Sequence, residues 1–81
     1  MQDSQTRTTT AAIWARVLDV EVDDSTDFFE AGGHSFAAMR ITAMVDDAFD
    51  MRTPARLLFD NPRFGDFVTA LEGQSRSAGS N

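Results

Sequence analysis

The chain has 81 residues with 7 arginines against 13 acidic residues, a formal net charge of −6 and no cysteine. A chain of this length forms one small domain with little room for an internal active site. The sequence has no basic stripe for nucleic acid, no run long enough to cross a membrane and no thiol to act as a nucleophile. We expect a cytoplasmic protein, because the N-terminus lacks the apolar core of a signal peptide.

The first predicted helix runs from about Thr9 to Asp19. Ile13 and Val17 lie at the i, i+4 spacing that is typical of an apolar helix face. A threonine within residues 8–10 can cap its start. Residues 1–8 are polar, and we expect them to be disordered.

A long acidic loop is predicted for residues 20–34, and no Lys or Arg lies between Arg16 and Arg40. Its acids do not match a calcium-binding loop, and a single histidine among scattered acids lacks the spacing of a metal site. Ordered loops of this length tend to be functional. We expect four apolar residues to hold the loop on the core, namely Val20, Val22, Phe28 and Phe29.

Three further helices are predicted over Ser35–Phe49, Pro54–Asp60 and Pro62–Glu72. Thr53 and Asn61 are candidate caps for the last two helices, and Gly73 is typical of a helix end. Residues 73–81 are small and polar, so we expect disorder there and a folded domain over 9–72. No segment reads convincingly as a strand. We therefore expect an all-α, four-helix bundle with a long first loop and a short third helix.

The second predicted helix carries two apolar stripes on a helical wheel. The stripe expected to face the core consists of Ala38, Ile41, Val45 and Phe49. Phe36, Met39 and Ala43 form the other stripe, which a small domain cannot bury as well. If this stripe is exposed, it would be a docking surface for a partner, with Arg40 at its edge. The alternative is that the preceding loop folds over Phe36.

Ser35 follows Gly32, Gly33 and His34 at the start of this helix. Serine before an apolar helical pattern is commonly an N-cap. A catalytic serine is poorly supported, because His34 is adjacent in sequence and such helical neighbours do not face each other. A third interpretation makes the hydroxyl an acceptor, since a helix N-terminus favours an attached phosphate.

The stretch DDSTDFFEAGGHSFAAMRITAMV resembles the core motif of peptidyl carrier proteins, the thiolation domains of nonribosomal peptide synthetases. That family shows D-x-F-F-E-L-G-G-[HD]-S-[LI] before a helix, and the later segment LFDNP is similar to its L-F-x-x-P. The resemblance covers about residues 10–72. The chain departs from the family pattern at Asp19, Ala31, Phe36 and Thr53.

The resemblance implies a carrier without catalytic activity of its own. Ser35 would carry 4′-phosphopantetheine, transferred from coenzyme A by a phosphopantetheinyl transferase, and Gly32, Gly33 and His34 would complete the attachment site. The thiol of this arm would hold an amino acid or peptide as a thioester. His34 favours the peptidyl over the acyl type.

The partners implied by the resemblance are an adenylation enzyme and condensation, thioesterase or tailoring enzymes of nonribosomal peptide, antibiotic or related natural-product biosynthesis. The docking residues implied are Phe36, Met39, Arg40 and Ala43. We expect a monomer that binds neither nucleic acid nor membrane. The start at Met1 and the polar tail suggest a free-standing carrier, although a domain excised from a larger synthetase fits equally.

Three alternatives remain open. The first is an acyl carrier for polyketide or fatty-acid chains. The second is a helical interaction module in which Ser35 is only a helix cap. The third is a small hydrolase, which would turn over esters through Ser35.

Overall fold

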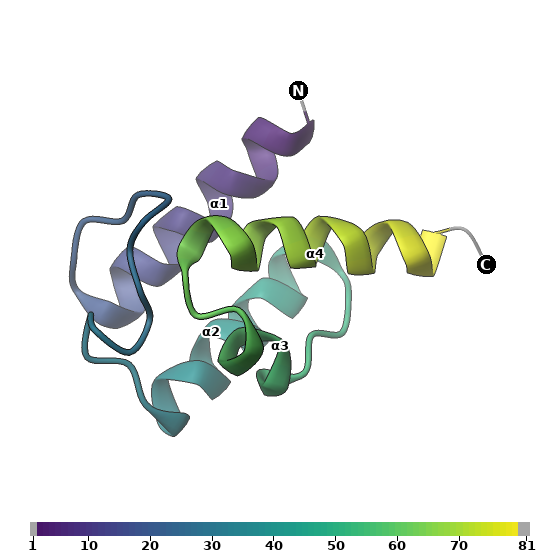
Figure 1. Ribbon diagram of the computed structural model, residues 1–81. Coiled ribbons are helices and arrows are strands. Elements are labelled where there is room, and N and C mark those ends of the chain that lie inside the picture. The colour runs from purple at the N-terminus through teal and green to yellow at the C-terminus, as the bar shows by residue number, and fades with distance from the viewer. Residues whose placement is uncertain (1, 80–81) are drawn as a thin grey trace.

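A computed structural model describes residues 2–79 as an all-helical domain. The helices are α1 (Gln2–Leu18), α2 (Ser35–Phe49), α3 (Ala55–Asp60) and α4 (Phe64–Gly79), as Figure 1 shows. The described residues contain no strand, only an isolated bridge between Asp27 and Arg63. This confirms the expected four-helix fold. Met1 and residues 80–81, which were expected to be disordered, lie outside the described residues.

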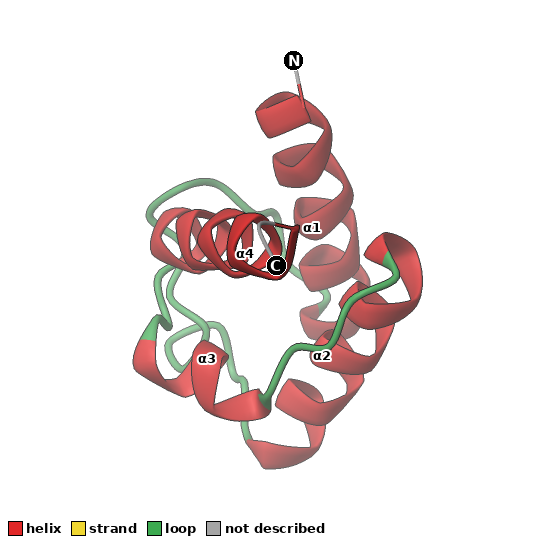
Figure 2. Ribbon diagram, turned by 90° about the vertical axis from the view of Figure 1, so that its right-hand side faces the viewer, coloured by secondary structure: helices red, strands yellow, loops and turns green. Residues whose placement is uncertain are grey.

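Helix α1 packs against α2 and α4, and helix α3 packs against the same two helices. Figure 2 shows the short α3 on the side of the bundle away from α1. The long first loop crosses from the end of α1 to the start of α2 (Figure 1). No helix within the described residues is both long enough and apolar enough to span a membrane.

An aromatic cluster centred on Trp14 fills the core. The Trp14 ring lies edge-on to Phe64 with centroids 5.1 Å apart, and its centroid is 6.0 Å from that of Phe28 and 5.7 Å from that of Phe67. All four side chains are almost completely buried. Since they come from α1, the loop and α4, this cluster joins three parts of the chain, and aromatic pairs in such geometries add to the stability from burial.

Phe28, with the backbone beside it, holds the long loop on the bundle. Its side chain is fully buried, and its N–H donates to the carbonyl of Pro62 at 2.7 Å. The N–H of Phe64 donates in turn to the carbonyl of Thr26 at 2.8 Å. Val22 is partly buried against the core, as expected. The expectation for Phe29 was wrong, because its side chain is 49% exposed.

The outer ends of α1 and α4 extend further than the sequence predicts. Helix α1 begins at Gln2 rather than near Thr9, and so includes residues that we expected to be disordered. Arg7 in this added part forms an ion pair with Asp24 of the loop. Helix α4 continues through Gly73 to Gly79, and the Gln74 side chain donates to the carbonyl of Arg52. These distant contacts support helix that local sequence does not specify.

The caps of the short helix α3 also differ from expectation. Pro54, not Thr53, is at its N-cap. The Thr53 N–H donates to the Asp46 carboxylate at 2.6 Å, and its buried hydroxyl makes no capping hydrogen bond within the described residues. Asn61 caps the end of α3 rather than the start of α4. Its side-chain amide donates to the carbonyl of Leu57 at 2.9 Å.

Candidate functional site

A single capped turn precedes the Gly-Gly-His-Ser segment. The Asp27 carboxylate accepts hydrogen bonds from the N–H of Phe29 at 2.8 Å and of Glu30 at 3.0 Å. The Asp27 carbonyl accepts another from Ala31 at 2.9 Å. A carboxylate in this position satisfies amides that would otherwise lack partners, as at a helix N-terminus. Asp27 therefore fixes the turn that leads into Ser35.

Glycine is required at positions 32 and 33 for two different structural reasons. Gly32 has φ +95°, a conformation that residues with a side chain rarely adopt. A Cβ on Gly33 would lie 2.5 Å from the ring of Phe28, so only glycine fits against that buried ring. The Gly33 N–H also donates to the Phe28 carbonyl at 2.8 Å. Gly32 thus supplies the left-handed backbone of the turn and Gly33 its close packing, where the sequence suggested only permissive backbone.

Ser35 is the first residue of α2, and its side chain is exposed. His34 is the N-cap residue, with φ −153° and ψ −174°, and its side chain makes no capping hydrogen bond. Its carbonyl accepts the first helical hydrogen bond, from Ala38 at 2.9 Å. The interpretation of Ser35 as an N-cap is therefore wrong.

The start of α2 is electrostatically suited to an anion. The first turn of α2 contains no acidic residue. The N–H groups of Ser35, Phe36 and Ala37 precede that of Ala38, which makes the first helical bond, so they point out of the helix end. The helix dipole adds partial positive charge at the same end. A phosphate bonded to the Ser35 oxygen would therefore fit here without burial or charge repulsion from this turn.

The second apolar stripe of α2 faces solvent. Phe36 is 64% exposed and Met39 is 62% exposed, and both Arg40 and Ala43 are exposed as well. The alternative in which the loop covers Phe36 is wrong. The opposite stripe is in the core as predicted, with Phe49 only partly buried at its end.

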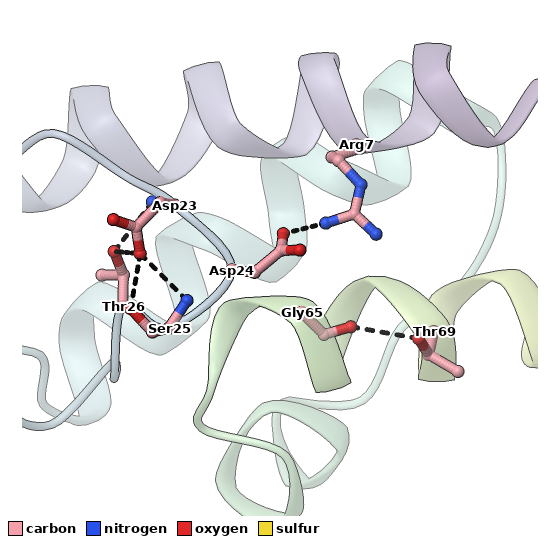
Figure 3. A network of polar contacts seen from close by, with 7 residues as sticks. All are labelled: Arg7, Asp23, Asp24, Ser25, Thr26, Gly65 and Thr69. Atoms are coloured by element: carbon pink, nitrogen blue, oxygen red, sulfur yellow. Dashed lines mark hydrogen bonds and ion pairs between the residues drawn. The ribbon is translucent and has the colours of Figure 1, made fainter.

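Two features that involve the long loop were not recognised in the sequence. One is an exposed stack of Phe29 on Phe59. The other is the Asp23 turn in Figure 3, where the carboxylate accepts bonds from the Ser25 N–H at 2.9 Å and the Ser25 hydroxyl at 2.8 Å. The side-chain bond from Ser25, and then its backbone bond, lower the pKa of Asp23. An Asp two residues before a Ser is the local signal that could have indicated this turn.

Known proteins match this chain over most of its length. The family model described as "Phosphopantetheine attachment site" matches residues 9–71. Phosphinothricin tripeptide synthetase PhsB from Streptomyces viridochromogenes is 42% identical over 62 residues, which are 75% of this chain and 5% of PhsB. Tyrocidine synthase 3 from Brevibacillus parabrevis is 40% identical over 63 residues, 76% of this chain and 1% of that protein. The chain thus spans a small fraction of these relatives.

Solved structures match the helical arrangement. BlmI, a type-II acyl-carrier-protein from Streptomyces verticillus involved in bleomycin biosynthesis, superimposes with a TM-score of 0.84 at 26% identity, covering 90% of this chain and 89% of BlmI. An active-site mutant of a peptidyl carrier protein gives a TM-score of 0.79 at 29% identity, covering 88% and 80%. Together these matches show that the chain belongs to the phosphopantetheine attachment family and is a carrier domain of the peptidyl type found in nonribosomal peptide synthetases.

Proposed function

We propose that Ser35 is the residue that carries the 4′-phosphopantetheine arm and that coenzyme A supplies it. The observation that carries this proposal is an exposed hydroxyl on the first residue of α2, after a turn fixed by Asp27 and Gly33. The Ser35 oxygen forms a bond to the phosphorus next to the pantetheine. The bond from that phosphorus to the bridging oxygen breaks, adenosine 3′,5′-bisphosphate leaves, and the serine proton is released.

The chain itself supplies position rather than catalysis. The outward N–H groups and the dipole of α2 favour the phosphodiester on Ser35. Gly32 and Gly33 keep the approach to the serine free of side chains, and His34 lies exposed beside it. A phosphopantetheinyl transferase would perform the transfer. The thiol of the arm explains how a chain without cysteine takes part in thioester chemistry.

The cargo in this proposal is an amino acid or peptide held as a thioester. Peptide synthetases are among the relatives of this chain, which favours this cargo. BlmI, although named an acyl-carrier-protein, is also similar, so an acyl cargo is the second candidate. Loading the thiol form with an amino acid through an adenylation enzyme, in comparison with a malonyl group through an acyltransferase, distinguishes the two.

Partner enzymes would dock on the exposed stripe of α2. Phe36 and Met39 provide apolar contact, Ala43 permits close approach and Arg40 lies at the polar rim. A patch of this size suits weak, reversible contacts, which a carrier needs when adenylation, condensation, thioesterase or tailoring enzymes use it in turn. We propose a monomeric carrier domain over residues 9–72 that acts in the cytoplasm.

The direct test is the intact mass of the protein after incubation with coenzyme A, magnesium and a broad-specificity phosphopantetheinyl transferase. We expect the mass to rise by one phosphopantetheine group in the wild type and to stay constant in Ser35→Ala. An unchanged wild-type mass would refute the carrier role. A rise that persists in Ser35→Ala would refute the assignment of Ser35.

A further inference from the structure

Two exposed aromatic side chains that do not belong to α2 stack on each other. Phe29 in the loop and Phe59 in α3 have ring centroids 6.1 Å apart and planes inclined by only 13°. Phe29 is 49% exposed and Phe59 is 38% exposed. The surface therefore presents a pair of parallel rings, which we call the Phe29–Phe59 stack.

Holding the loop and α3 on the core does not require this stack. Each of its rings directly follows a fully buried residue, Phe28 before Phe29 and Leu58 before Phe59. Those two neighbours anchor the two segments. The two rings adjoin each other and so form a contiguous exposed apolar surface, which is a candidate for binding a ligand or a tethered group.

The stack lies within reach of Ser35. The Phe28 ring touches the site of Gly33, and its centroid is 5.2 Å from that of Phe29 and 6.5 Å from that of Phe59. Gly33 precedes Ser35 by two residues, at most about 7.6 Å between Cα atoms. An extended phosphopantetheine arm of about 14 bonds spans about 17 Å from the serine oxygen to the sulfur. The end of the arm can therefore meet the stack.

The acidic loop beside the stack suits a cation. Glu30, next to Phe29, is exposed, and residues 20–34 carry no Lys or Arg. The exposed Arg63 is bridged to Asp27, two residues before Phe29, and the two acids Asp27 and Glu30 outweigh it by one charge. On α3, Asp60 forms an ion pair with Arg56 at 3.5 Å, so those two charges offset each other. Aromatic faces themselves attract ammonium groups. An aminoacyl thioester offers an apolar side chain together with a free ammonium group, whereas a simple acyl chain offers no cation.

We propose that the Phe29–Phe59 stack is the resting site for the cargo end of the arm, and that it favours an aminoacyl group with an apolar or aromatic side chain and a free amine. This inference rests on the proposed attachment at Ser35. The rings contact the cargo side chain, and Glu30 faces its ammonium group. The tether keeps the cargo at a high local concentration near the stack. Weak contacts are therefore enough to make the cargo spend more of its time on the stack.

The test uses coenzyme A analogues transferred to the full chain. One carries phenylalanine through a stable amide in place of the thioester, a second carries N-acetylphenylalanine in the same linkage, and the third is coenzyme A itself. NMR of the Phe29 and Phe59 ring protons then reports contact with the cargo. We expect shifts with phenylalanine and none with the bare arm. We expect the ring-bound population with the N-acetyl form to be about two- to fivefold smaller, as for loss of an exposed cation–π contact.

Matched variants localise the contact. Phe59→Ala is expected to abolish the cargo-dependent shift at Phe29. Phe49→Ala, which removes a phenylalanine at the far end of α2 and outside the stack, is expected to preserve it once the mass confirms loading. Ring signals of a loaded wild-type chain that do not differ from those with the bare arm would overturn this inference while leaving the carrier role intact. Failure of the mass to rise would instead refute the proposed function.

Discussion

Replacing Asp27 by alanine tests whether the capped turn sets the attachment site. The change removes the oxygen that accepts the N–H groups of Phe29 and Glu30 at 2.8 and 3.0 Å. Loss of a comparable cap at a helix N-terminus costs about 0.5–2 kcal/mol. We expect the free energy of unfolding to fall by about 1–2 kcal/mol, since one oxygen serves two amides. For a domain of this size the midpoint of thermal unfolding would fall by roughly 5–15 °C.

Two matched variants make this prediction specific. Asp27→Asn keeps an acceptor oxygen, so it should lose about half as much stability or less. Glu30→Ala removes an acid of the same loop for which no side-chain hydrogen bond is found among the described residues, and should change stability by no more than about 0.5 kcal/mol.

The assay is urea and thermal unfolding followed by far-UV circular dichroism, together with the rate of phosphopantetheine transfer to each variant. A loosened turn should lower the transfer rate of Asp27→Ala at temperatures where it remains folded, and Asp27→Asn should restore most of it. The reasoning is refuted if Asp27→Ala unfolds like the wild type, or if Asp27→Asn loses as much stability as Asp27→Ala.

Further predictions concern packing and titration. Gly33→Ala places a methyl group 2.5 Å from the buried ring of Phe28, so we expect a loss of about 1–3 kcal/mol in urea unfolding, and unchanged stability would contradict the close packing. Ile41→Ala removes a fully buried side chain and should cost about 2–5 kcal/mol, whereas Met39→Ala on the exposed stripe should stay within about 0.5 kcal/mol. Equal losses would mean that the two stripes are misassigned. The lowered pKa of Asp23 means that its contribution to stability is present above its unfolded-state pKa and is lost as the pH falls through its folded-state value. NMR titration of its carboxyl carbon should give a midpoint below that of an ordinary aspartate, and an ordinary midpoint in the wild type would contradict the Ser25 hydrogen bonds.

The sequence predicted those parts of the fold that depend on local pattern. Helix α2 has the expected bounds, because a strong apolar period starts after two glycines and ends before a left-handed Asp50. Its two stripes follow from helical geometry alone, so the core face and the exposed face were both predicted. The resemblance of the Gly-Gly-His-Ser segment likewise led to the family.

What the sequence could not predict depends on contacts between distant residues. The outer ends of α1 and α4 are joined to other segments by Arg7 with Asp24 and by Gln74 with Arg52. Adjacent phenylalanines give no local sign of which one is buried, so Phe28 and Phe29 were both expected in the core. Only the three-dimensional structure brings Phe29 onto Phe59 and shows that Gly33 must be small because Phe28 lies against it.

Peptide mapping of the modified protein tests the assignment of Ser35 most directly. Trypsin cuts after Arg16 and Arg40, so residues 17–40 form one peptide that contains three hydroxyl residues, Ser25, Thr26 and Ser35. The Ser25 and Thr26 hydroxyls are both hydrogen-bonded to Asp23, whereas Ser35 is exposed at a helix start. Fragmentation should place the phosphopantetheine group on Ser35 alone. A group on Ser25 or Thr26, or a peptide that remains unmodified after complete reaction of a control carrier, would contradict the account.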